Sequence, residues 1–147
     1  MKITVFGAGA IGGYIAVKLA EAGHDVSVVA RGAHLAAIGE RGLILDDRGQ
    51  RRVSRVRATD RAADLGAQDL VVLTLKAHAM EEAAPAIAAL LGPETVLLPA
   101  QNGIPWWFGH RAGGALDGIR IAAIDRGGVI ERHLDPARVV GCVVYMA

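Results

Sequence analysis

Short apolar runs rich in β-branched residues alternate along this chain with longer alanine-rich runs. The first apolar run is Lys2–Phe6, an alanine-rich run follows at Ile11–Ala22, and a second apolar run follows at Asp25–Ala30. Short β-branched runs are typical of strands, whereas the alanine-rich runs have the length of helices. This regular alternation predicts strand–helix–strand units, and such units form parallel sheets.

The same pattern continues to the end of the chain. A short helix is expected at His34–Arg41, and Leu43–Leu45 and Arg52–Val56 flank a polar turn segment in the manner of a β-hairpin. The remaining expected elements are strands at Asp69–Leu75, Thr95–Leu98 and Val139–Tyr145, helices at Ala77–Leu91 and from Pro105 through Phe108, and a short turn at Asp135-Pro136. The predicted fold class is α/β, a Rossmann-like, doubly wound and mainly parallel sheet formed by one domain over residues 1–147.

A glycine-rich element joins the first predicted strand to the first predicted helix. Gly7-Ala8-Gly9-Ala10-Ile11-Gly12 has the spacing G-x-G-x-x-G, and its place between strand and helix is the context that distinguishes a dinucleotide fingerprint from an ordinary turn. Gly7 allows the tight turn, Gly9 lets the backbone approach a pyrophosphate, and Gly12 lets helix and strand pack closely. The helix N-terminus then offers free N–H groups to the phosphates.

The residues after the second strand indicate which nucleotide is bound. NAD enzymes usually carry an acidic residue there, which accepts a hydrogen bond from the ribose 2′-hydroxyl. This chain has Ala30-Arg31-Gly32 instead. Arg31 can hold a 2′-phosphate through charge-assisted hydrogen bonds, so the sequence predicts NADP(H); the alternative is a solvated loop arginine.

Two further residues end predicted strands at the same edge of the sheet. Lys76 follows Asp69–Leu75, and Asn102 follows Thr95–Leu98 within Gln101-Asn102-Gly103. Open α/β sheets bind ligands at the carboxyl ends of their strands, so both are candidates to contact the cofactor and the substrate. The alternatives are an ordinary surface lysine and an ordinary turn asparagine.

Charge and composition narrow the class of partner. Sixteen basic and 15 acidic residues give a net charge of +1, which argues against nucleic acid or an anionic membrane as a partner. The basic residues at Arg48–Arg57 are expected to form a solvated hairpin. The five histidines show no paired spacing typical of a metal site.

Other features are typical of a soluble domain. Cys142 is the only cysteine and, within an apolar run, is expected to be a small buried residue. No signal peptide or apolar run of about 18 residues is present, so we expect a cytoplasmic protein without a membrane span. Trp106, Trp107 and Phe108 are expected to pack against a partner domain, and His78 is expected to be a bystander.

Taken together, these features resemble the ketopantoate reductase (2-dehydropantoate 2-reductase) family. The resemblance is carried by Gly7–Gly12, Ala30-Arg31-Gly32, Leu73-Thr74-Leu75-Lys76-Ala77, Gln101-Asn102-Gly103-Ile104-Pro105-Trp106-Trp107 and the closing stretch Val140–Ala147. This family reduces the ketone of ketopantoate with hydride from NADPH, giving pantoate for pantothenate and coenzyme A biosynthesis. Its proton-donating lysine and substrate-binding glutamate lie in a C-terminal helical domain.

The resemblance implies a role for each candidate residue. Pyrophosphate would be bound by Gly7, Ala8, Gly9, Ala10, Ile11 and Gly12, and the 2′-phosphate by Arg31. Lys76 and Asn102 would line the site near the nicotinamide and a small 2-keto acid substrate. Ala147 would lie at the reactive end of the cofactor.

The chain closes soon after its last predicted strand, and no catalytic residue can be assigned within it. We therefore expect an NADP-binding fragment of a two-domain oxidoreductase, inactive by itself. One alternative is the cofactor domain of another NADP-dependent 2-keto acid reductase. A non-enzymatic nucleotide sensor is a second alternative, although such domains generally keep an acid where Arg31 stands. Uncovered apolar surface favours a homodimer or a self-associating monomer.

Overall fold

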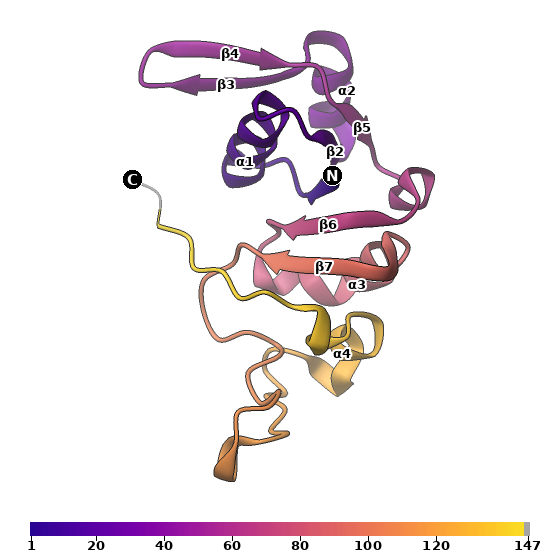
Figure 1. Ribbon diagram of the computed structural model, residues 1–147, viewed down its shortest axis with the longest axis vertical. Coiled ribbons are helices and arrows are strands. Elements are labelled where there is room, and N and C mark those ends of the chain that lie inside the picture. The colour runs from indigo at the N-terminus through magenta and orange to yellow at the C-terminus, as the bar shows by residue number, and fades with distance from the viewer. Residues whose placement is uncertain (146–147) are drawn as a thin grey trace.

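The computed structural model describes residues 1–145. These residues form a parallel sheet with helices packed against it (Figure 1). The sheet has the strand order β5-β2-β1-β6-β7, and every adjacent pair is parallel. Its strands are β1 (Lys2–Phe6), β2 (Asp25–Val29), β5 (Arg57–Thr59), β6 (Gln68–Leu73) and β7 (Leu91–Pro99). The chain builds outward from β1 on one side through β2 and then on the other side through β6. The predicted doubly wound α/β fold is therefore confirmed, and its switch point lies between β1 and β6.

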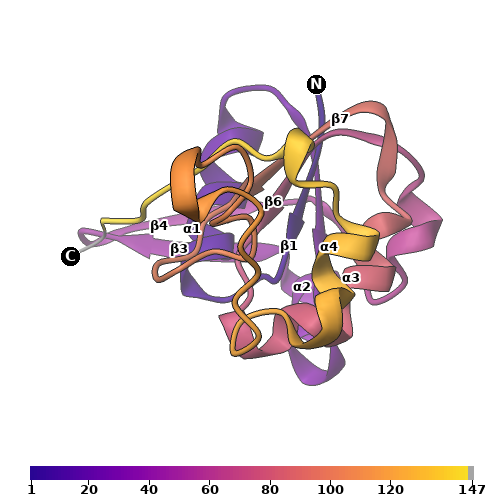
Figure 2. The same ribbon diagram turned by 90° about the horizontal axis from the view of Figure 1, so that it is seen from below.

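Helices connect these strands and cover the sheet. The four α-helices among residues 1–145 are α1 (Ala10–Glu21), α2 (Gly32–Arg41), α3 (Met80–Ala88) and α4 (Val129–His133). Helices α3 and α4 lie side by side (Figures 1 and 2). Short 3₁₀ turns stand at Ala62–Leu65 (η1), Ala77–Ala79 (η2), Gly114–Leu116 (η3), Arg126–Gly128 (η4) and Pro136–Arg138 (η5). The turn predicted at Asp135-Pro136 is confirmed, because Asp135 Oδ1 accepts a hydrogen bond from Ala137 N at 2.9 Å.

The predicted hairpin is formed by β3 (Leu43–Asp47) and β4 (Gln50–Ser54), which project beyond α1 (Figure 1). Its turn is shorter than expected, since Arg48 and Gly49 alone connect the strands. Both have positive φ, 50° and 79°, as the two-residue turns favoured in hairpins require. The basic residues of this hairpin are not all free, because Arg52 pairs with Glu21 of α1 at 2.8 Å.

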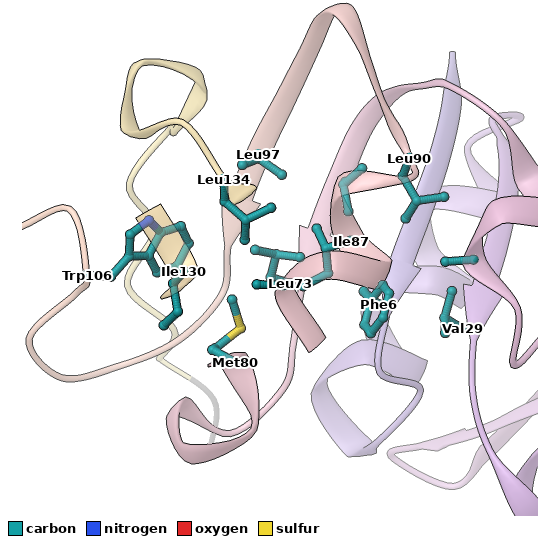
Figure 3. Close-up of a cluster of buried hydrophobic side chains, with 13 residues drawn as sticks. Phe6, Val29, Leu73, Met80, Ile87, Leu90, Leu97, Trp106, Ile130 and Leu134 are labelled. Atoms are coloured by element: carbon teal, nitrogen blue, oxygen red, sulfur yellow. The ribbon is translucent and has the colours of Figure 1, made fainter. Parts of the chain in front are cut away.

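Apolar side chains bury both faces of the central strands. On one face Ile3 and Val5 of β1 pack with Val17 of α1 and Val28 of β2. On the other face the buried residues are Phe6, Val29, Ala62, Val71, Leu73, Met80, Ala84, Ile87, Leu90, Leu97, Trp106, Ile130 and Leu134 (Figure 3). Central strands of parallel sheets are covered on both faces, which explains their near-continuous apolar sequences.

The helix predicted over Ala77–Leu91 is shorter than the sequence suggested. It divides into the turn η2 and helix α3, and β7 already begins at Leu91. The reason is pairing with the neighbouring strand, since Gln68 N donates to Leu90 O at 2.9 Å and Gln68 pairs with Leu91. The predicted end of this helix at Leu91 was therefore wrong, since α3 ends at Ala88.

The predictions around the tryptophans and the chain end also need correction. Pro105 opens a series of turns, not a helix, and Trp106 is 7% exposed within the domain's own core beside Ile130 (Figure 3), not at a surface for a partner. The last predicted strand, Val139–Tyr145, forms isolated bridges at Val139 and Cys142 alone. Cys142 is half-buried, not enclosed as expected; it packs at the margin of the core and forms an isolated bridge with Ala100.

Candidate functional site

The glycine turn between β1 and α1 forms one wall of the candidate site. Gly7 has a φ of +104°, a conformation that favours glycine, and its N–H donates to Val29 O at 3.0 Å. Gly9 is the N-cap of α1, and a side chain there would have open space around it. Within the described residues, no side chain caps α1 and no acidic residue stands in its first turn. Its first N–H groups therefore stay available for an anion.

Gly12 brings α1 close to this turn. A Cβ at Gly12 would lie 1.9 Å from Gly7 O and 2.5 Å from Thr74 Oγ1. The backbone at the three glycines thus has the expected geometry: a positive φ at Gly7, open space at Gly9 and close packing at Gly12.

The carboxyl ends of β6 and β7 form the opposite wall. A cavity of about 390 Å³ lies between the two walls, within the range of small-molecule sites. Its lining residues are Gly9, Ala10, Ile11, Thr74, Leu75, Lys76, Ala77, Ala100, Gln101, Asn102 and Val144. The tertiary structure therefore brings the glycine turn, Lys76 and Asn102 to one hollow at the switch point of the sheet.

Lys76 is an exposed residue that precedes η2 at the rim of this cavity. No carboxylate of residues 1–145 forms a salt bridge with it. An exposed ammonium group at this edge can bind a phosphate or a carboxylate of a ligand.

Asn102 makes a contact that the sequence did not reveal. Its Nδ2 donates to Val144 O and its Oδ1 accepts from Val144 N, both at 2.9 Å. The side-chain amide therefore pairs with the backbone as a neighbouring strand would, and it holds the segment after Val139 against the site. One N–H of Nδ2 and one lone pair of Oδ1 remain for a ligand.

Gln101 and Thr74 are site residues that sequence reasoning missed. Gln101 Nε2 donates to Leu75 O, which ties the loop after β7 to the loop after β6. Thr74 Oγ1 contacts the carbonyl groups of Phe6 and Gly7. Their polarity was the feature of the sequence that could have identified them, since both are uncharged polar residues that closely follow apolar strands.

Arg31 lies between the end of β2 at Val29 and the start of α2 at Gly32. It is the N-cap residue of α2, its side chain is 72% exposed, and its Nη1 lies 3.4 Å from Glu82 Oε1. Beside the glycine turn, a hollow of about 310 Å³ is lined by Ala8, Gly9, Ala10, Gly13, Tyr14, His34, Leu43, Ile44 and Leu45. His34 belongs to α2, the helix that Arg31 precedes, but Arg31 itself does not line this hollow.

The remaining candidates are less informative. His78 is exposed in η2 and does not line the cavity. Ala147 lies outside the described residues. Residues 1–145 contain no group of three or more metal-ligating side chains. Among these residues, no helix has the length and apolar character needed to cross a membrane.

Comparison with known proteins identifies relatives over most of the chain. Residues 3–110 match the family described as ketopantoate reductase PanE/ApbA. A 2-dehydropantoate 2-reductase from Mesorhizobium japonicum is 55% identical over 100% of this chain and 45% of its own length. A 2-dehydropantoate 2-reductase from Pyrococcus horikoshii is 35% identical over 71% of this chain and 34% of its own length.

A solved structure shows the same fold. The crystal structure of a candidate ketopantoate reductase from Ralstonia solanacearum superposes with a TM-score of 0.94 and 45% identity, covering 99% of this chain and 45% of that one. The chain thus spans less than half the length of these relatives.

Proposed function

This chain belongs to the ketopantoate reductase family, and we propose that it forms the NADPH-binding part of a 2-dehydropantoate 2-reductase. The observation that carries the proposal is the cavity in which the glycine turn meets Lys76 and Asn102. In the proposed reaction, NADPH supplies a hydride to the ketone carbon of a 2-keto acid, and a proton completes the hydroxyl group. The product would be pantoate, which is used for pantothenate and coenzyme A biosynthesis.

The proposed cofactor preference rests on Arg31. This side chain is exposed where β2 ends, in the position that an acidic residue takes in NAD-binding domains. A guanidinium group there favours a ribose 2′-phosphate, because it carries a positive charge and several donors. Its contact with Glu82 is long and solvated, so phosphate can take its place at little cost.

The proposed roles of Lys76 and Asn102 follow from their chemistry. Lys76 is a cation without a carboxylate partner among residues 1–145, and it would attract the carboxylate of a 2-keto acid or a cofactor phosphate. Asn102 would use its remaining donor and acceptor near the nicotinamide. The turn Gly7–Gly9 and the first N–H groups of α1 would hold the pyrophosphate.

Calorimetric titration of the chain with NADPH and with NADH, at one salt concentration, tests this proposal. We expect NADPH to bind about tenfold or more tightly, since a hydrogen bond to a charged group contributes about 1.5–3 kcal/mol. Arg31→Ala should lower NADPH affinity to the level of NADH and leave NADH affinity unchanged. The matched control is Arg51→Ala, which removes an exposed arginine from the hairpin strand β4. Equal affinities of the unaltered chain for the two cofactors would contradict the proposed preference.

A further inference from the structure

Thr74 lies where β6 ends and meets the glycine turn. Its N–H donates to Phe6 O at 3.1 Å, and its Oγ1 is 3.1 Å from the same carbonyl oxygen. The hydroxyl group also makes a short hydrogen bond to Gly7 O. Thr74 is half-buried and lines the cavity described above. One side chain therefore contacts the last carbonyl of β1 and the first carbonyl of the turn.

This contact completes the attachment of Gly7. The Gly7 N–H group donates to Val29 O at 3.0 Å, so β2 holds one side of the residue. Thr74 holds the other side through Gly7 O. A peptide group is planar, so fixing Gly7 O also fixes the direction of the next N–H group, that of Ala8. The two bonds together set the orientation of the turn that precedes α1.

The N-terminus of α1 rests on the same atoms. A Cβ at Gly12 would meet Gly7 O at 1.9 Å and Thr74 Oγ1 at 2.5 Å, so the backbone of Gly12 is in close contact with both. The position of the first turn of α1 thus depends on where Thr74 holds Gly7 O. That first turn carries the N–H groups that are free to bind an anion.

We propose that Thr74 is a positioning residue for the pyrophosphate of the cofactor. Its hydroxyl group holds the turn Gly7–Gly9 in the shape that aims the N-terminus of α1 at the phosphates. This inference rests on the proposed function, because it assigns a role within the same cofactor site. It does not require Thr74 to touch the cofactor.

The hydroxyl group, and not the size of the side chain, carries this role. Valine has nearly the shape of threonine, but it cannot donate to Gly7 O. In Thr74→Val that carbonyl loses its partner, and the turn is free to adopt other orientations. Thr74→Ser keeps the donor and should keep the turn in place.

The experiment compares two ligands on the same variants by NMR titration of the full 147-residue chain. NADPH has a pyrophosphate that would meet the turn, whereas 2′-AMP has only the phosphate assigned to Arg31. We expect Thr74→Val to weaken NADPH binding about tenfold or more, the equivalent of one hydrogen bond of about 1.4 kcal/mol. Binding of 2′-AMP should stay the same, and Thr74→Ser should bind NADPH like the unaltered chain.

Each outcome decides the question. Equal NADPH affinity of Thr74→Val and the unaltered chain would overturn this inference alone. An equal loss for NADPH and 2′-AMP would also overturn it, because it would indicate general disruption of the domain. Failure of the unaltered chain to bind NADPH would overturn the proposed function together with this inference. If Thr74→Val does not fold, Thr74→Ser against Thr74→Ala isolates the same hydroxyl group with smaller side chains.

Discussion

Replacing Gly12 with alanine tests how tightly the glycine turn packs against α1. The added Cβ would lie 1.9 Å from Gly7 O and 3.1 Å from Gly7 C, and neither backbone atom can rotate away. Since real Cβ atoms keep contacts above 3.0 Å, the turn and the helix must separate by about 3.0 − 1.9 = 1.1 Å. That movement would disturb the hydrogen bonds that Gly7 makes with Val29 and Thr74.

The expected loss of stability follows from these contacts. Overpacking costs about 1–3 kcal/mol, and the two disturbed hydrogen bonds cost about 1 kcal/mol each. Alanine is a better helix former than glycine and returns about 1 kcal/mol. Gly12→Ala should therefore lower the free energy of unfolding by about 2–4 kcal/mol, which corresponds to a Tm lower by roughly 4–16 °C for a domain of this size.

Thermal and urea unfolding followed by circular dichroism measure this effect. Gly13→Ala is the matched control, because it makes the same change at the next position of the same helix. There the new Cβ would lie 3.8 Å from Ala8 O and 3.9 Å from Leu43 Cδ1, which are ordinary contacts. This control should gain about 0.5–1 kcal/mol. If the two variants proved equally stable, the close contact of Gly12 with the turn would not be the reason for its glycine.

Two further predictions concern contacts outside the turn. Asp125 is 1% exposed and accepts hydrogen bonds from Ile130 N at 2.8 Å and Glu131 N at 3.1 Å, so Asp125→Ala should cost about 2–4 kcal/mol in urea unfolding. The exposed cap Asp135→Ala should cost about 0.5–1 kcal/mol, and a similar loss for both variants would contradict this reasoning. Asn102→Ala should speed amide hydrogen exchange at Val144 about tenfold or more. Val140, whose N–H donates to Leu97 O at 2.9 Å, should keep its protection; unchanged exchange at Val144 would show that Asn102 does not hold this segment.

The local pattern was sufficient for the first half of the fold. The strand expected at Lys2–Phe6 matches β1 at both ends, and the second predicted strand differs from β2 by one residue. Here apolar periodicity, glycine turns and helix length agree, and each can be read within a few neighbouring residues. The same agreement made the glycine fingerprint recognisable, because its meaning depends on the strand before it and the helix after it.

Weak or short elements were decided by distant partners. β5, at Arg57–Thr59, was not predicted, since three residues with one arginine and one threonine carry no apolar pattern. It exists because Ser27–Val29 of β2 offer a free edge for pairing. Conversely, Val139–Tyr145 has the composition of a strand but does not form one: it makes isolated bridges at Val139 and Cys142.

The candidate site shows the same division between local and distant information. The sequence by itself determined which residues end strands at the ligand-binding edge, among them Lys76 and Asn102, because strand ends and turn residues are local properties. Only the tertiary structure decided that Thr74 meets Gly7, 67 positions away, and that Asn102 pairs with Val144, 42 positions away. A hydrogen bond between such residues depends on how the strands are ordered in the sheet, and no periodicity along the chain records that order.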